Sequence, residues 1–208
     1  MTFAFGKGAL ATVLAVWLTG CATHLQPAQL TKVQSVGVID DFPAVPNYAV
    51  VGTTIFNNDF DDINAPHFKK LLEQTAMRAL TAKGYQPEII SQDQQQQFDL
   101  VLKLEPAAIP DMLWTWGYGV YQRSEFTVPK TAVTYMAIKV LPYIHGKLLC
   151  SDCYYQQQLP LLLKKLPANW QALSSQQQAV IGDTLESTIE YTVSGAFKDM
   201  GLTPATFH

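Results

Sequence analysis

The chain has 208 residues, of which 48% are hydrophobic and 15% charged, and its formal net charge at pH 7 is −3. This length is sufficient for one domain with a hydrophobic core. The acidic balance argues against nucleic acid as a partner.

Residues 1–20 have the pattern of a secretory signal peptide, in which Lys7 precedes an apolar run from Gly8 to Leu18. The run is shorter than the roughly 20 residues that a transmembrane helix needs. Removal of this segment leaves 13 basic residues, one fewer than the 14 of the whole chain, against 17 acidic ones. The alternatives are a signal peptide without lipidation and a buried N-terminal helix of a cytosolic protein.

The tetrapeptide Leu18-Thr19-Gly20-Cys21 resembles the lipobox of bacterial lipoproteins at all four positions. The resemblance implies cleavage before Cys21, a diacylglyceryl group on its sulfur and usually a further acyl chain on its amino group. Two or three acyl chains anchor a protein stably to a membrane. Ala22, where Asp would favour the inner membrane, implies the outer membrane, with the domain facing the periplasm. Residues 36–39 and 52–58 also loosely resemble small uncharacterised proteobacterial lipoproteins, which imply no activity.

Residues 21–32 are interpreted as the lipidated N-terminus and a polar tether, and residues 33–208 as a single periplasmic domain. In its first half the hydrophobic pattern predicts strands and a helix in the order ββαββ, over residues 33–39, 48–56, 65–83 (the helix), 85–90 and 98–104. Residues 57–64 are expected to form a loop. This order predicts an α+β fold, in which the helix packs on a small mixed or antiparallel sheet.

The second half predicts a β-hairpin and a long C-terminal helix. The hairpin arms are expected over residues 131–141 and 148–159, with a turn near residues 145–147. The helix is expected to begin near Ser174 or Ser175 and to end at Gly201.

An unusual stretch from Pro106 to Tyr121 concentrates aromatic residues between glycines. Tryptophan and tyrosine combine a large apolar area with a polar edge and are enriched at partner interfaces. The stretch is therefore a candidate partner surface, formed by Trp114, Trp116, Tyr118 and Tyr121. The alternative is an ordinary hairpin whose rings fill the core.

Cys150 and Cys153 are the cysteines that remain once Cys21 is lipidated. In an oxidising compartment they are expected to form a local disulfide. The CxxC spacing also occurs in thiol-disulfide enzymes, but there the pair sits at the start of a helix. Here the flanking sequence predicts extended chain, which favours a structural bond.

The sequence supports neither a metal site nor a catalytic site. Five acidic residues gather in two loops, namely Asp40, Asp41, Asp59, Asp61 and Asp62. Counted from Asp59, the calcium-loop pattern fails at its glycine and glutamate positions, which are Asn64 and Lys70. The four histidines have no metal-binding spacing, and no nucleophile-elbow, phosphate-loop or dinucleotide motif occurs. We predict no catalytic residue, no metal and no cofactor.

These patterns predict a membrane-anchored envelope lipoprotein that acts as a non-enzymatic binding or assembly factor. Its partners are then the membrane, through the lipid on Cys21, and an envelope protein. Two alternatives stay open: a periplasmic thiol-disulfide enzyme that uses Cys150 and Cys153, and a small-ligand binding module with an apolar pocket.

Overall fold

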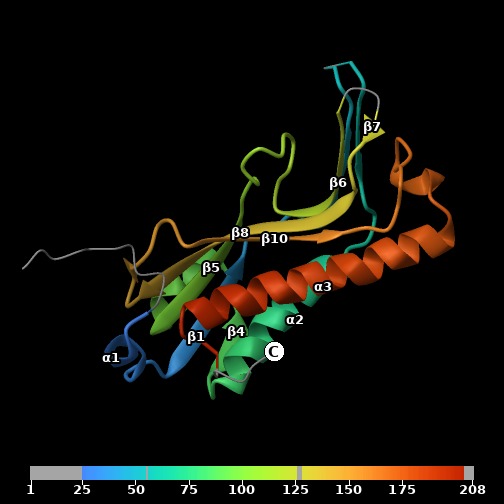
Figure 1. The fold of residues 1–208 in the computed structure, drawn as a ribbon. Helices are drawn as coiled ribbons and strands as arrows, with labels where there is room; N and C mark the ends of the chain where they lie inside the picture. Colours follow the sequence, from blue (N-terminus) through green and yellow to red (C-terminus); the bar gives the residue numbers. More distant parts are fainter. Residues whose placement is uncertain (1–24, 55, 126–127, 204–208) are drawn as a thin grey trace, which may run out of the picture.

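The computed structural model describes residues 25–54, 56–125 and 128–203 and has the predicted α+β fold. A curled mixed sheet forms one layer, and two helices that pack on one of its faces form the other (Figure 1). These helices are α2 (His67–Ala82) and α3 (Ser175–Asp199), which contact each other along their length. Among the described residues, no helix has the length and apolar character needed to cross a membrane.

The long strand β8 (Val133–Ile144) joins the two halves of the sheet. One edge of β8 pairs antiparallel with two strands: its first part pairs with β6 (Tyr118–Glu125) and its second part with β5 (Leu100–Pro106). The other edge pairs with β10 (Tyr154–Pro160). The remaining strands are β1 (Ser35–Asp40), β2 (Asn47–Val51), β3 (Asn58–Asp62), β4 (Gln86–Ile89), β7 (Val128–Pro129) and β9 (Lys147–Leu148). Neighbouring strands follow the order β3-β2-β6-β8-β5-β1-β4, so β3 and β4 lie at the edges.

Both long helices occur where the sequence predicted them. The α3 helix begins with a capping box, in which Ser174 Oγ accepts a hydrogen bond from Gln177 N and Gln177 Oε1 accepts one from Ser174 N. Glycines follow both helices, Gly84 with φ +97° and Gly201 with φ +75°, as left-handed C-terminal caps require. The described residues also contain three shorter helices: α1 (Pro27–Leu30), η1 (Gln92–Gln97) and η2 (Trp170–Ala172).

The sheet confirms most of the predicted strands and corrects one loop. The hairpin of β8 and β10 is present, with its turn at residues 145–146, where both φ angles are positive. The predicted loop over residues 57–64 was wrong, because Asn58–Asp62 form β3, which pairs antiparallel with β2. Its acidic residues hid the strand pattern, and an edge strand tolerates such charges because one side is open to water.

The segment 21–32, expected to be a polar tether, is described from residue 25 onwards, and this part packs on the domain. Leu25 is buried, and its amide donates a hydrogen bond to Met200 O over 3.1 Å. The α1 helix follows directly, close to the C-terminal end of α3. Cys21 lies outside the described residues.

Asp40, the last residue of β1, has a buried carboxyl group. The side chain of Asp40 is 2% exposed; its Oδ1 accepts a hydrogen bond from Phe42 N, and its Oδ2 lies 3.5 Å from Lys69 Nζ. Burial raises the pKa of Asp40 despite the opposing effects of the Phe42 amide and Lys69. Burial and the nearby Asp40 also raise the pKa of Glu73. The folded protein therefore disfavours ionisation of this pair.

We predict that Asp40→Asn removes part of a pH dependence of stability. A raised pKa in the folded state means that stability falls as the pH rises from the unfolded value of 3.8 through the folded value. The unfolding free energy of the variant, measured by urea denaturation, should therefore rise relative to that of the wild type as the pH increases from 3.8 through the raised folded-state pKa. A difference that is constant over this interval, or that moves the other way, would contradict the prediction.

Candidate binding surface

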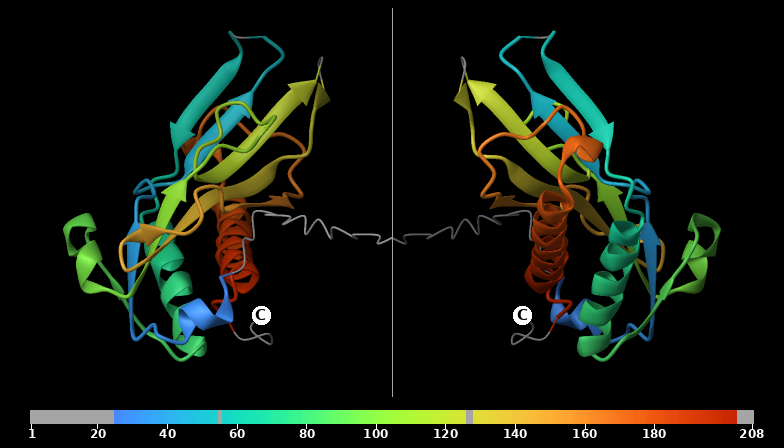
Figure 2. Two further views of the ribbon diagram at one scale, coloured as in Figure 1. Left: turned by 90° about the vertical axis from the view of Figure 1, so that its left-hand side faces the viewer. Right: turned by 90° about the vertical axis from the view of Figure 1, so that its right-hand side faces the viewer.

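The loop of residues 107–117 connects β5 to β6 and lies across the sheet face that is turned away from the helices (Figure 2). Along β8, Met136 and Ile138 face the helices, whereas Tyr135 and Ala137 face the loop. Ala107 and Ile109 of the loop pack with these outer side chains in a small second core. The loop is therefore a packed part of the domain.

Hydrogen bonds from two buried or partly buried side chains hold the far end of this loop. Asn47 Nδ2 donates to Trp114 O over 2.9 Å and to the Tyr135 hydroxyl over 3.1 Å. The same hydroxyl accepts a hydrogen bond from Trp116 N over 3.2 Å. Burial raises the pKa of Tyr135 to about 12, so the hydroxyl stays protonated at neutral pH. Asn47 and Tyr135 thus connect β2 and β8 to the backbone on either side of Thr115.

The buried Thr115 fixes the middle of the loop. Its hydroxyl accepts a hydrogen bond from Ile109 N over 3.0 Å and donates one to Met112 O over 2.8 Å. Gly117 N donates to Ala107 O over 2.9 Å, which closes the loop at its base. These contacts satisfy several backbone groups that regular strands would otherwise pair.

Trp114 has a backbone conformation that is unusual for its residue type. Its φ angle is +69°, in the left-handed region, which costs a residue with a Cβ atom about 1–2 kcal/mol. Strained backbone of this kind persists where the surrounding contacts determine it, and it is found often at functional sites. Here the hydrogen bonds that Asn47 and Tyr135 make with the loop backbone hold Trp114 in this conformation.

The loop presents large apolar side chains to solvent. Trp114 is 62% exposed and Trp116 is 55% exposed. The Trp114 ring contacts Phe60 of β3, which is 50% exposed, with 5.4 Å between the ring centroids. We call the set of Phe60, Leu113, Trp114 and Trp116 the aromatic surface. The acidic residues Asp62 and Asp111 are exposed in the same segments, whereas Asp59 points to the opposite face of β3.

Two of the four residues predicted for a partner surface are in the core instead. Tyr118 is fully buried, and its hydroxyl donates a hydrogen bond to Pro43 O over 3.0 Å. Tyr121 is buried on the opposite face, in the outer core. The prediction was wrong for both because they belong to β6, an interior strand that is covered on both faces. Phe60, Asn47 and Tyr135 were missed, since no local pattern links them to the loop.

The two cysteines form the predicted disulfide, with their Cα atoms 5.8 Å apart. The bond lies in the segment between β9 and β10, and no helix begins there. Cys153 is fully buried. A thiol-disulfide enzyme needs an accessible sulfur at a helix N-terminus, so this environment does not favour the enzyme alternative.

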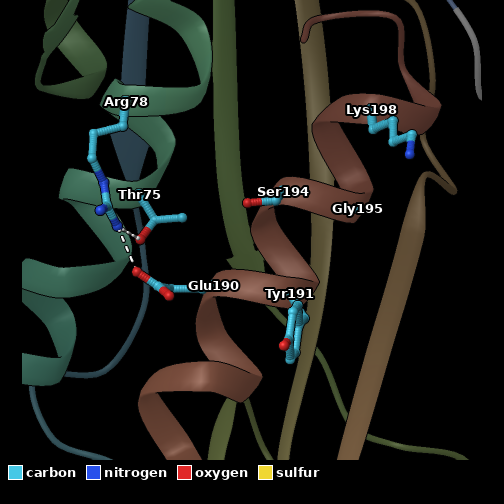
Figure 3. A pocket seen from close by; sticks show the side chains of 7 residues that line it. All are labelled: Thr75, Arg78, Glu190, Tyr191, Ser194, Gly195 and Lys198. Atoms are coloured by element: carbon cyan, nitrogen blue, oxygen red, sulfur yellow. Dashed lines mark hydrogen bonds and ion pairs between the residues drawn. The ribbon is translucent and has the colours of Figure 1, made fainter. Parts of the chain in front are cut away.

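A hollow of about 460 Å³ lies between α2 and α3 (Figure 3). The Arg78 guanidinium and the Glu190 carboxylate form an ion pair over 2.7 Å there, and Arg78 also donates a hydrogen bond to Thr75. Both charged side chains are well exposed, and the hollow is open to solvent. Ser194, Glu190 and Lys198 all line it, but no hydrogen bond joins the Ser194 hydroxyl to either charged side chain, so the described geometry shows no activated nucleophile.

The described part of the chain holds no group of three or more residues that could bind a metal ion. His67 stacks on Phe68, and His145 lies 3.8 Å from a carboxylate oxygen of Asp99. His24 and His208 lie outside the described residues. Asp40 and Asp41, at the end of β1, and the aspartates of β3 form no such group either.

No family model and no curated protein matches the sequence. The structure is similar to protein XCC0632 of Xanthomonas campestris, from family DUF330, with a TM-score of 0.39, 11% identity and coverage of 78% of this chain and 80% of that chain. It is also similar to PelC of Paraburkholderia phytofirmans, whose structure is a dodecamer, with a TM-score of 0.33, 12% identity and coverage of 81% and 89%. Neither likeness supports the transfer of a function.

Proposed function

We propose that the chain is a lipid-anchored protein of the bacterial envelope whose domain binds a partner protein through the aromatic surface. The observation that carries this proposal is the exposed Trp114 ring on a strained backbone that Asn47 and the buried Tyr135 hold in place. Large rings are costly to leave in water, and ordered rings lose little entropy on binding. A surface of this kind is suited to anchoring a partner.

The anchor in this proposal is Cys21, lipidated after cleavage before it and sorted to the outer membrane because Ala22 follows. The packed Leu25 adds a geometric consequence. Four residues span at most about 14 Å, so the end of the domain that carries α1 stays close to the bilayer. The loop of residues 107–117 lies well apart from α1, on the sheet face turned away from α2 and α3 (Figures 1 and 2). The aromatic surface then faces the periplasm. The disulfide suits an oxidising compartment.

The charges beside the aromatic surface indicate the chemistry of the partner. Asp62 stands on the edge strand β3, on the same face as Phe60, and Asp111 stands in the loop. Carboxylates on an edge strand disfavour the addition of a further strand. We therefore infer recognition through side chains, with apolar pockets on the partner that are bordered by lysine or arginine.

The anchoring proposal predicts the mass of the mature N-terminus. In a Gram-negative host, the wild-type chain should begin at Cys21 and carry acyl groups, whereas Cys21→Ala should stay unlipidated and uncleaved. Ala22→Asp should keep its lipid and move to the inner membrane. Mass spectrometry of the intact protein from separated membranes measures both. A wild-type protein with a free Cys21 thiol, or with a different N-terminus, would refute the anchor.

The binding proposal predicts position-dependent crosslinking in cells. A photo-crosslinking amino acid at position 114 or 116 should capture the same protein, through a peptide that contains basic residues. The matched control is position 191, since Tyr191 is 64% exposed on α3, away from the loop. Trp114→Ala should abolish capture from position 116. Failure of both loop positions, or equal capture from position 191, would show that the aromatic surface is not the contact.

A further inference from the structure

We propose that a hollow at the α1 end of the domain binds the headgroup phosphate of an anionic membrane phospholipid. The hollow has a volume of about 530 Å³, and the side chains that matter here are Leu25, Pro27, Leu30, Lys83, Lys198 and Thr203. The inference rests on the proposed membrane anchor and deepens it, because it identifies a lipid contact made by the folded domain itself.

Three chain segments that are distant in sequence build the hollow. The α1 segment lies against the C-terminal ends of α2 and α3, near Lys83 and Gly201. The hydrogen bond from Leu25 N to Met200 O fixes this arrangement. Leu25 is buried, and Pro27 and Leu30 continue the apolar wall along α1.

The charge of the hollow is positive. Lys83 and Lys198 are exposed and line it from two helices, and no acidic side chain of the described residues lines it. The helix ends carry partial negative charge, but chain amides already bind their terminal carbonyls: Lys83 N and Tyr85 N donate to Leu80 O, and Leu202 N donates to Phe197 O. Two ammonium groups beside an apolar wall match an anionic headgroup attached to acyl chains.

Thr203 supplies an unused hydrogen-bond donor in the same hollow. It is only 5% exposed, and its Oγ1 has no hydrogen-bond partner among the described residues. A buried hydroxyl without a partner is unfavourable, and buried polar groups are usually paired. A phosphate oxygen that enters between the two lysines would accept this hydrogen bond.

The short distance along the chain between Cys21 and Leu25 keeps the hollow close to the membrane. Leu25 follows Cys21 by four residues, and this length spans at most about 14 Å. When Cys21 carries its acyl groups in the bilayer, the hollow lies within reach of the headgroup layer. A free phosphate ion would satisfy Thr203 and the lysines but would leave the apolar wall uncovered.

The test is native mass spectrometry of the full chain, purified from membranes in a nonionic detergent and titrated with short-chain phosphatidylglycerol. We expect one saturable phospholipid adduct, and weaker adducts with phosphatidylcholine of the same chain length. Lys83→Glu combined with Lys198→Glu should lower the affinity for phosphatidylglycerol at least about thirty-fold, as expected for two surface lysines. The matched control is Lys164→Glu combined with Lys165→Glu, an equal charge change at exposed lysines between β10 and η2, which should bind as the wild type does.

Thr203→Val separates a ligand contact from a structural role. The hydroxyl has no partner in the described chain, so its loss should leave the unfolding free energy unchanged or higher, while phosphatidylglycerol binding weakens. Equal binding by the wild type and the double lysine variant would overturn the proposal. Equal binding of phosphatidylglycerol and phosphatidylcholine would also overturn it. So would the displacement of phosphatidylglycerol by inorganic phosphate at millimolar concentration, or a protein dimer in place of the lipid adduct. The same spectra report the acyl groups on Cys21. An unlipidated chain that binds phosphatidylglycerol would therefore refute the proposed anchor but still support lipid binding in the hollow.

Discussion

The burial of β8 on both faces is the constraint on which the rest of the structure depends. Thr134, Met136 and Ile138 pack towards α3 and the main core, and the Thr134 hydroxyl lies 2.6 Å from that of Thr188. Tyr135 and Ala137, which alternate with them, form the outer core beneath the loop of residues 107–117. Because successive side chains of a strand point to opposite faces, docking the helices on β8 also sets the direction of Tyr135. The loop is positioned by the same strand that organises the core.

This connection explains how the domain can hold apolar rings in water. Apolar side chains that are free to collapse would bury themselves, and strained backbone would relax. The Tyr135 hydroxyl and Asn47 prevent this by binding the loop backbone from a rigid sheet. Two separate parts of the molecule then have distinct surfaces: aromatic and acidic at the loop, apolar and basic at α1. Such an arrangement fits the proposal of an anchor near α1 and a partner at the loop.

Local patterns in the sequence were sufficient for the helices, the hairpin and the disulfide. The α2 and α3 helices have apolar residues at helical spacing and a glycine after each C-terminus, and α3 also has a capping box. The cysteines are too close in sequence to need long-range information. The β3 strand was missed because its charges conceal any alternation. Tyr118 and Tyr121 were assigned to a surface because the sequence does not show that β6 lies between β2 and β8. The contacts of Asn47 and Tyr135 with the loop depend on that same register, so Trp114 and Trp116 were found by composition alone.

The central claim is that the protein holds Trp114 in a strained backbone conformation in which its ring is exposed. A pair of matched substitutions tests this claim most directly. Glycine accepts a φ angle of +69° without strain, so Trp114→Gly relieves a cost that Trp116→Gly, at a position without positive φ, does not. Urea denaturation should therefore show Trp114→Gly to be more stable than Trp116→Gly by about 1 kcal/mol or more. Equal unfolding free energies for the two variants would contradict the account, because they would mean that the backbone at Trp114 stores no strain.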